Sequence, residues 1–71
     1  MSKWSSQKAK QVLKALLRND WFIKRTTASS HKILSKEGYP DYTFAFHDKD
    51  EIGPPMLSRI AKQTGLIPED L

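Results

Sequence analysis

The sequence contains no cysteine, which excludes disulfide bonds and thiolate metal sites and suits a reducing compartment. It has only two histidines, too few to predict a zinc site. No apolar run is longer than three residues, and the first residues lack the apolar core and the cleavage site of a signal peptide. We therefore expect a cytoplasmic protein that binds no membrane, metal or small-molecule cofactor.

The composition is that of a small globular protein. Of the 71 residues, 38% are hydrophobic and 28% are charged. A chain of this length buries only about 60% of the surface that its unfolded form exposes, so its stability is marginal. We expect one domain over residues 1–71, with a core at residues 5–66 and loose ends at residues 1–4 and 67–71. Without disulfides or metal, a protein partner is the remaining source of added stability.

Charge is divided unevenly along the chain. Residues 1–36 carry nine lysines and arginines and a single acid, whereas residues 37–71 carry three basic and seven acidic residues, for a net charge of +4. Such a distribution suits a polyanionic ligand on one face, and nucleic acid is the main candidate for a basic chain this short. The simpler alternative is a lysine-rich helix that only faces solvent.

Apolar residues at helical spacing predict an amphipathic helix in the first quarter of the chain. Ser5 or Ser6 is a natural N-cap, and Asn19-Asp20 marks its end. Most of the lysines in this segment lie off the apolar stripe and face water. The stripe consists of Ala9, Val12, Leu13, Leu16 and Leu17.

Three short strands are expected after this helix. Aromatic and β-branched residues predict a strand over residues 21–26, and a small polar turn at residues 28–30 leads to a second strand over residues 31–35. Turn-forming residues occupy positions 36–41. Alternation with period two predicts a half-buried third strand over residues 42–47. Its aromatic residues are Tyr42, Phe44 and Phe46.

A second amphipathic helix closes the chain. Pro54 or Pro55 can open it, and Gly65 ends it. Because both helices have an apolar stripe to bury and the sheet has one aromatic face, we expect an α+β fold with both helices on one face of a three-stranded antiparallel sheet. The other face of the sheet is then open to solvent. The second stripe consists of Met56, Leu57, Ile60, Ala61 and Thr64.

His31 is the main candidate for chemistry. It follows Ser29 and Ser30 at the start of the second strand, with basic residues on both sides. Free imidazole has a pKa of about 6.5, so a histidine can deprotonate a ribose 2′-hydroxyl while nearby lysines and arginines neutralise the phosphate. The competing interpretation is a surface histidine in a turn. Strand alternation does not decide which face of the sheet His31 occupies. It groups His31 with Ile33 on one face and Lys32 with Leu34 on the other, so each face has an apolar residue.

His47 is a weaker candidate. We expect it at the end of the third strand, facing away from the aromatic side chains. There it is either a second acid or base or, next to Asp48, has a capping or charge-pairing role, which we favour. Asp48, Asp50 and Glu51 form an acidic cluster that could bind a divalent ion. Such clusters are more often solvated loops, so we predict no metal site.

Several short motifs resemble those of a known family in identity and order. They are Trp21-Phe22-Ile23-Lys24-Arg25, Ala28-Ser29-Ser30-His31, His47 followed by Asp50-Glu51-Ile52, and Leu57-Ser58-Arg59-Ile60-Ala61-Lys62-Gln63-Thr64-Gly65-Leu66. Together with the lysine-bearing first helix, they resemble the HicA family, small toxins of type II toxin–antitoxin modules. The resemblance spans residues 6–66. Two positions differ from the family pattern: Asp20 and Ala28 replace glycines, and alanine is less permissive of positive φ.

The resemblance implies a fold and an activity. The fold is the α-β-β-β-α arrangement of double-stranded-RNA-binding domains, and the activity is ribosome-independent cleavage of mRNA, which inhibits translation and growth. A HicB antitoxin silences HicA toxins, and His31 occupies the position of the family's catalytic histidine. We expect RNA contacts at Lys24, Arg25, Ser29, Ser30 and Lys32.

Two alternative functions remain. A non-catalytic RNA-binding module of the same fold would have the same composition and charge, and only His31 and the family resemblance favour an enzyme. A DNA-binding domain is the weaker alternative, because the second helix carries only Arg59 and Lys62 as basic residues outside its apolar stripe.

Overall fold

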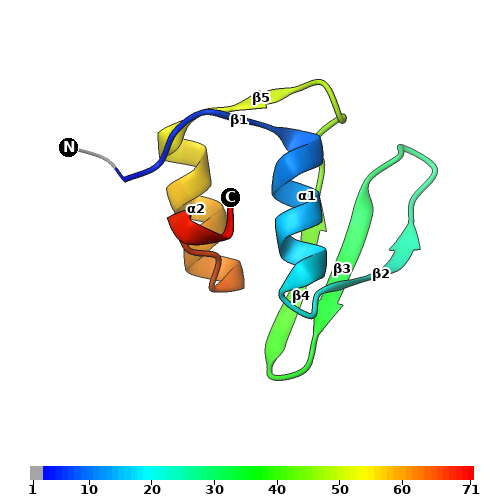
Figure 1. The fold of residues 1–71 in the computed structure, drawn as a ribbon. Helices are drawn as coiled ribbons and strands as arrows, with labels where there is room; N and C mark the ends of the chain where they lie inside the picture. The colour runs from blue at the N-terminus through cyan, green and yellow to red at the C-terminus, as the bar shows by residue number, and fades with distance from the viewer. Residues whose placement is uncertain (1–2) are drawn as a thin grey trace.

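The computed structural model describes residues 3–71 and has two helices packed with a three-stranded antiparallel sheet (Figure 1). The order of these main elements is α-β-β-β-α, which confirms the expected fold. Within the described residues, no helix is both long and apolar enough to cross a membrane. In chain order the elements are β1 (Gln7–Lys8), α1 (Ala9–Arg18), β2 (Phe22–Thr26), β3 (Lys32–Lys36), β4 (Tyr39–Phe44), β5 (Glu51–Ile52), α2 (Pro54–Thr64) and a 3-10 helix, η1 (Pro68–Asp70).

The main sheet has the order β2-β3-β4, so β2 and β4 are its edge strands. Each pairing has an irregularity, one between Ile23 and Arg25 in β2 and one between Leu34 and Lys36 in β3. A second, two-stranded sheet pairs β1 with β5 and was not expected from the sequence. It joins the segment before α1 to the segment before α2, so the two helices begin at the same end of the molecule (Figure 1).

One buried cluster combines residues of both helices with Leu34 and Phe44 of the sheet. The two apolar stripes were largely correct, but Leu17 and Met56 are 40% and 37% exposed, and Ala15 is buried instead. Leu17 lies in the last turn of α1 and Met56 in the first turn of α2, where the core no longer covers the edge of each stripe. The buried members are Ala9, Val12, Ala15, Leu16, Trp21, Leu34, Phe44, Ile52, Leu57, Ile60 and Leu66.

The first helix does not use a serine cap. It begins at Ala9, its N-cap residue is Lys8, and no side chain caps it, so the prediction of Ser5 or Ser6 was wrong. The loop before β5 replaces the cap, because the Ala9 N–H donates to the Asp50 carbonyl at 2.7 Å and the Lys10 N–H to the Asp48 carbonyl at 3.3 Å. A free helix end needs acceptors for its first N–H groups, and here a distant segment supplies them.

The predicted end of α1 at Asn19-Asp20 is confirmed. Asn19 is the C-cap, and Asp20 follows in the left-handed conformation at φ 71°. The Trp21 N–H then donates to the Leu16 carbonyl at 3.2 Å. This is the 6→1 hydrogen bond of a Schellman motif, which spans six residues. This turn directs the Trp21 side chain back into the core, where it is 2% exposed.

The turn between β3 and β4 is shorter than predicted. Glu37 and Gly38 alone form it, with Gly38 at φ 85°, and β4 already begins at Tyr39. The sequence predicted a turn over positions 36–41 partly because of Pro40. That residue instead lies within β4, because β4 is an edge strand and edge strands tolerate proline. β4 also ends at Phe44, so residues 45–47 lie outside the third strand.

The second helix matches its predicted boundaries. It begins at Pro54, ends at Thr64, and has Gly65 as a left-handed C-cap at φ 76°. A β-carbon on Gly65 would also lie only 2.9 Å from the Tyr39 hydroxyl oxygen. Residues 67–71, for which the sequence predicts a loose end, contain η1; Leu71 packs against the core, and Arg18 donates to the Asp70 carbonyl. Of the predicted loose end at residues 1–4, residues 1–2 lie outside the described part, and Trp4 packs against the core.

Asp20 offers a direct test of this turn. Replacing it with glycine removes the steric cost of a β-carbon at φ 71°, which exceeds the extra chain entropy of glycine, so we expect the free energy of unfolding to rise by about 0.5–1 kcal/mol. Asp20→Ala is the matched control, because it removes the charge but keeps the β-carbon. Thermal unfolding measures both. Equal stabilisation by the two variants would assign the effect to charge and contradict this interpretation.

Candidate functional site

The turn between β2 and β3 carries His31 and is held by three hydrogen bonds. The Thr27 N–H donates to the His31 carbonyl at 2.8 Å, and the Ser30 N–H donates to the Thr27 carbonyl at 2.9 Å. The His31 N–H donates to the Thr27 Oγ1 at 3.2 Å. Ser30 has φ 66°, so the turn is a three-residue loop whose last residue is left-handed, a common hairpin connection. Ala28 does not have positive φ, so its β-carbon adds no backbone strain.

The register of the hairpin decides which face of the sheet His31 occupies. Arg25 pairs with Ile33, Thr26 pairs with Lys32, and the Thr27–His31 hydrogen bond extends this ladder by one position. Because side chains alternate along a strand, His31 and Arg25 lie on one face and Lys32 on the other. Lys32 also pairs with buried Phe44, which identifies its face as the one that the helices cover. His31 and Arg25 therefore lie on the open face, as diagonal neighbours about 7–8 Å apart at Cα.

Lys24 lies on the same open face but is already paired. Its Nζ is 3.0 Å from the Asp41 Oδ2, and both side chains are partly exposed. The hydrogen bond from Lys24 holds the pKa of Asp41 below its usual value, with smaller contributions from Ser35 and Arg25. Because Ser35 of β3 contributes to this shift, the ion pair spans the central strand, and less of the Lys24 charge is available to a ligand than of the Arg25 charge.

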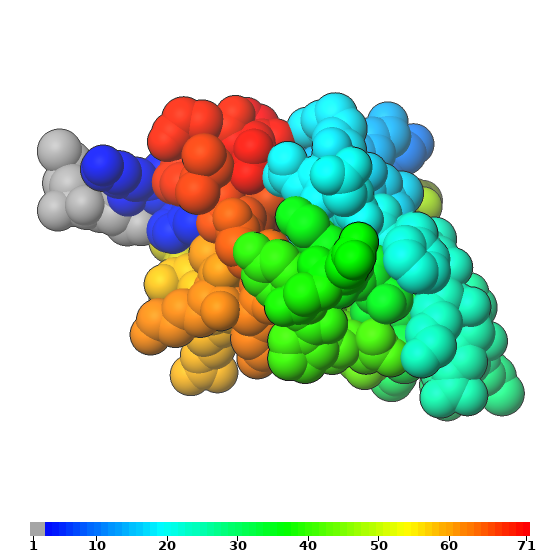
Figure 2. All heavy atoms as spheres, turned by 90° about the horizontal axis from the view of Figure 1, so that it is seen from below, coloured from blue at the N-terminus to red at the C-terminus, as the bar shows by residue number. Residues whose placement is uncertain are grey.

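Apart from Lys24, the predicted site residues of the hairpin divide into two groups. Arg25, Ser29, Ser30 and His31 are exposed, and Arg25 and His31 share the open face beside the turn that contains the two serines. Lys32 is half-buried on the opposite face, so the structure does not bring it together with His31. The hairpin extends beyond α1 at the right of Figure 1 and forms the protruding cyan to blue-green end in Figure 2. A long ligand can therefore reach it without meeting the helices.

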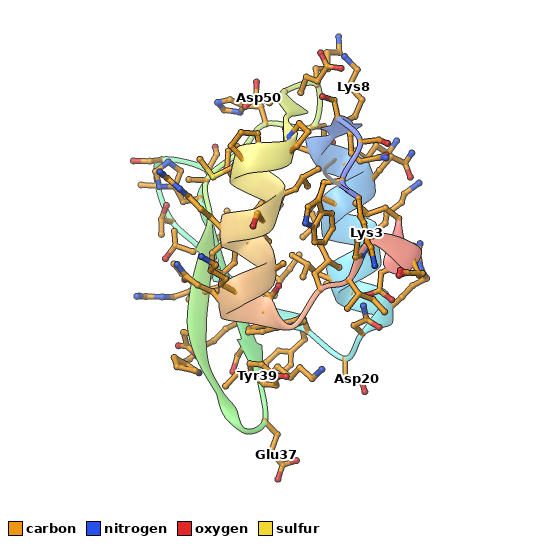
Figure 3. The ribbon with its side chains drawn as sticks, turned by 90° about the vertical axis from the view of Figure 1, so that its left-hand side faces the viewer. Lys3, Lys8, Asp20, Glu37, Tyr39 and Asp50 are labelled. Carbon is orange, nitrogen blue, oxygen red and sulfur yellow. The ribbon has the colours of Figure 1, made fainter. Side chains whose placement is uncertain are left out.

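His47 is not at the end of a strand, as the sequence had suggested, because β4 ends three residues earlier. It is exposed, and its backbone closes a tight turn: the His47 N–H donates to the Asp50 Oδ2 at 2.9 Å, and the Asp50 N–H donates to the His47 carbonyl at 2.9 Å. This is the turn whose carbonyls cap α1, and Figure 3 shows Asp50 near Lys8 at that end of the helices. The residues that cap α1 are thus Asp48 and Asp50, through their backbone carbonyls, and the His47 ring takes no part in the cap.

Two other features bear on ligands. No group of three or more histidine, cysteine, aspartate or glutamate residues able to hold a metal occurs in residues 3–71. A shallow hollow of about 440 Å³ lies between the start of β4 and the end of α2, at the opposite end of the sheet from the β2–β3 turn. Figure 3 labels its lining residue Tyr39 at that end of the molecule, where the helices end and Asp20 also lies. The hollow is thus separate from the His31 region. Its lining residues are Tyr39, Pro40, Asp41, Lys62 and Gln63.

A comparison with protein families now decides the identity of the chain. The model described as "HicA toxin of bacterial toxin-antitoxin" matches residues 9–66 of the 71. The chain belongs to the HicA family. No curated protein and no solved structure matches it. As a HicA toxin, it is one component of a bacterial toxin–antitoxin system, whose other component is an antitoxin.

The two positions at which the sequence resemblance implies glycine differ in backbone conformation. Asp20 adopts positive φ, which is the conformation that favours glycine. Ala28 is free of that requirement, because Ser30 is the left-handed residue of this turn.

The sequence did not identify Thr27 as part of this site. Thr27 accepts the His31 N–H through its side chain and pairs with His31 and Ser30 through its backbone. A signal was present, because threonine hydroxyls often bond to nearby backbone groups at turns. The sequence alone did not reveal which of Thr26 and Thr27 faces the histidine.

Proposed function

We propose that this HicA toxin is an endoribonuclease that cleaves mRNA without the ribosome, with His31 as its general acid or base. The observation that supports this most is the placement of His31 and Arg25 on the same open face, beside an exposed turn with two serines. Within the described residues the His31 imidazole makes no hydrogen bond to the protein, so both ring nitrogens are available to a substrate.

The chemistry needs few groups. As a base, His31 takes the proton of a ribose 2′-hydroxyl, and the resulting oxygen attacks the adjacent phosphorus. The bond to the 5′-oxygen breaks, a 2′,3′-cyclic phosphate forms, and the leaving 5′-oxygen takes up a proton from water. Negative charge grows on the phosphate oxygens during this step, and the Arg25 guanidinium on the same face can stabilise it. The Ser29 and Ser30 hydroxyls supply further hydrogen bonds to the phosphate.

RNA binding itself is expected to be electrostatic and sensitive to salt. Affinity should fall by about 0.7–0.9 log units per log unit of salt for each phosphate neutralised. Arg25→Glu should weaken binding most, because Lys24 is paired with Asp41 and Lys32 lies on the covered face. Lys49→Glu is the matched control and should have the smallest effect. Titration of a labelled transcript at several salt concentrations measures both variants beside Lys24→Glu and Lys32→Glu, and salt-independent affinity would contradict the hypothesis.

His31→Ala tests the chemistry. Loss of one positioned acid–base group should reduce cleavage about 10²–10⁴-fold, while the exposed position of His31 leaves folding and RNA affinity nearly unchanged. His47→Ala should cleave at close to the normal rate, because the backbone of His47, not its ring, holds the acidic loop.

The assay is cleavage of a defined transcript by the purified protein, with binding measured on the same RNA. Undiminished cleavage by His31→Ala would remove this histidine from the mechanism. Binding without cleavage by the unsubstituted protein would favour the RNA-binding module instead.

We further propose that the antitoxin is of the HicB type and covers the open face of the sheet, including His31. Edge strand β2 is exposed along its whole length, and Phe22, which pairs with Ser35 on the open face, is 55% exposed. An unpaired edge with exposed apolar side chains is suited to contact with another protein.

Expression from the native operon provides the test for the antitoxin. The toxin should co-purify with a protein encoded beside it, and the complex should melt at a higher temperature than the free toxin, because a partner that binds only the folded state stabilises it. Phe22→Ala should weaken the complex more than Met56→Ala, a similarly apolar exposed residue on α2. Equal losses from both variants would place the antitoxin elsewhere.

A further inference from the structure

The Thr27 hydroxyl has a specific place in the hairpin turn. In a regular antiparallel pair, the two residues of a hydrogen-bonded position exchange both of their N–H···O bonds. Here only one of these is present between Thr27 and His31, from the Thr27 N–H to the His31 carbonyl at 2.8 Å. The Thr27 carbonyl instead accepts the Ser30 N–H at 2.9 Å, because Ser30 is left-handed and inserts an extra residue into this strand.

This insertion leaves the His31 N–H without its usual backbone acceptor. The Thr27 Oγ1 accepts it at 3.2 Å. Thr27 is half-buried, and a β-branched side chain has few χ1 rotamers, so its hydroxyl is held more firmly than a serine hydroxyl at a free surface would be. The side chain of Thr27 therefore completes the bonding that the bulge interrupts.

The imidazole has no comparable support of its own. The described residues provide no hydrogen-bond partner for the His31 ring, and the residue is exposed. The direction of the ring thus depends on the backbone of His31, and that backbone is fixed on one side by β3 and on the other only by the contacts with Thr27. Displacement of a catalytic group by about 1 Å can lower a rate by about 10²-fold.

We propose that Thr27 is a positioning residue for His31, and that its hydroxyl orients the histidine for proton transfer. This inference rests on the proposed function. The Thr27 hydroxyl is already engaged with the His31 N–H, so we expect it to affect the chemical step and not RNA binding.

The test compares three variants of the full-length protein. Thr27→Val keeps the branched shape and removes only the hydroxyl, and we expect kcat to fall about tenfold while KM and RNA affinity stay within about twofold. Thr27→Ser restores a hydroxyl and should recover most of kcat. Thr26→Val is the matched control: Thr26 is the neighbouring exposed threonine on the opposite face, its side chain makes no hydrogen bond to the described residues, and its kcat should be unchanged.

The results separate this inference from the proposed function. A normal kcat in Thr27→Val, with His31→Ala inactive, would overturn the positioning role and leave the nuclease intact. An equal loss in Thr27→Val and Thr27→Ser would also overturn it, because the hydroxyl would then not be responsible. Normal cleavage by His31→Ala would instead remove the proposed function.

Amide hydrogen exchange gives a second measurement that needs no cleavage assay. If the hydroxyl holds the His31 N–H, that amide should exchange at least about tenfold more slowly in the unsubstituted protein than its unprotected rate, and Thr27→Val should abolish the protection. Exchange of the His31 amide at the unprotected rate in the unsubstituted protein would overturn the inference, whatever the stability of the variants.

Discussion

The buried indole of Trp21 fixes the arrangement of the whole chain. It lies where α1 passes into β2, is 2% exposed, and donates from Nε1 to the Thr64 carbonyl at the end of α2 over 3.3 Å. Its ring is 5.5 Å from that of Tyr39, which begins β4 and covers Gly65. One side chain thus joins both helices and the sheet, and the left-handed turn at Asp20 is what directs it inward.

This arrangement separates the stable part of the molecule from the reactive part. The tryptophan end has two aromatic rings, a helix cap and the close approach at Gly65. The β2–β3 turn lies at the other end of the sheet. Strand β2, which leads to it, is exposed along its whole length, and local hydrogen bonds rather than core packing hold the turn. Such a segment can reach a large substrate, but its geometry depends on a few polar contacts, which is why a single hydroxyl can matter there.

The sequence predicted what depends on local periodicity and turn chemistry. Both helices, the element order and the glycine that ends α2 follow from neighbouring residues. The cap of α1 could not be predicted, because its acceptors come from a loop some forty residues away. Likewise, strand alternation alone did not show which face of the sheet His31 occupies, and the pairing of Lys32 with buried Phe44 decided it. Pairing of Lys24 with Asp41, seventeen residues away, also required the sheet.

The charge asymmetry of the sequence corresponds to a separation of basic and acidic residues in the structure. Residues 21–36, which form the hairpin, contain four lysines and arginines and no acid. Of the acids that follow, Asp41 pairs with Lys24 of the hairpin, Asp50 closes the loop that caps α1, and Asp70 accepts the Ile67 N–H. Negative charge near the N-terminus of α1 is itself favourable. The acidic half of the chain thus stabilises the fold and leaves the hairpin cationic, so a phosphate that approaches His31 meets no carboxylate on the strand-turn-strand segment that carries it.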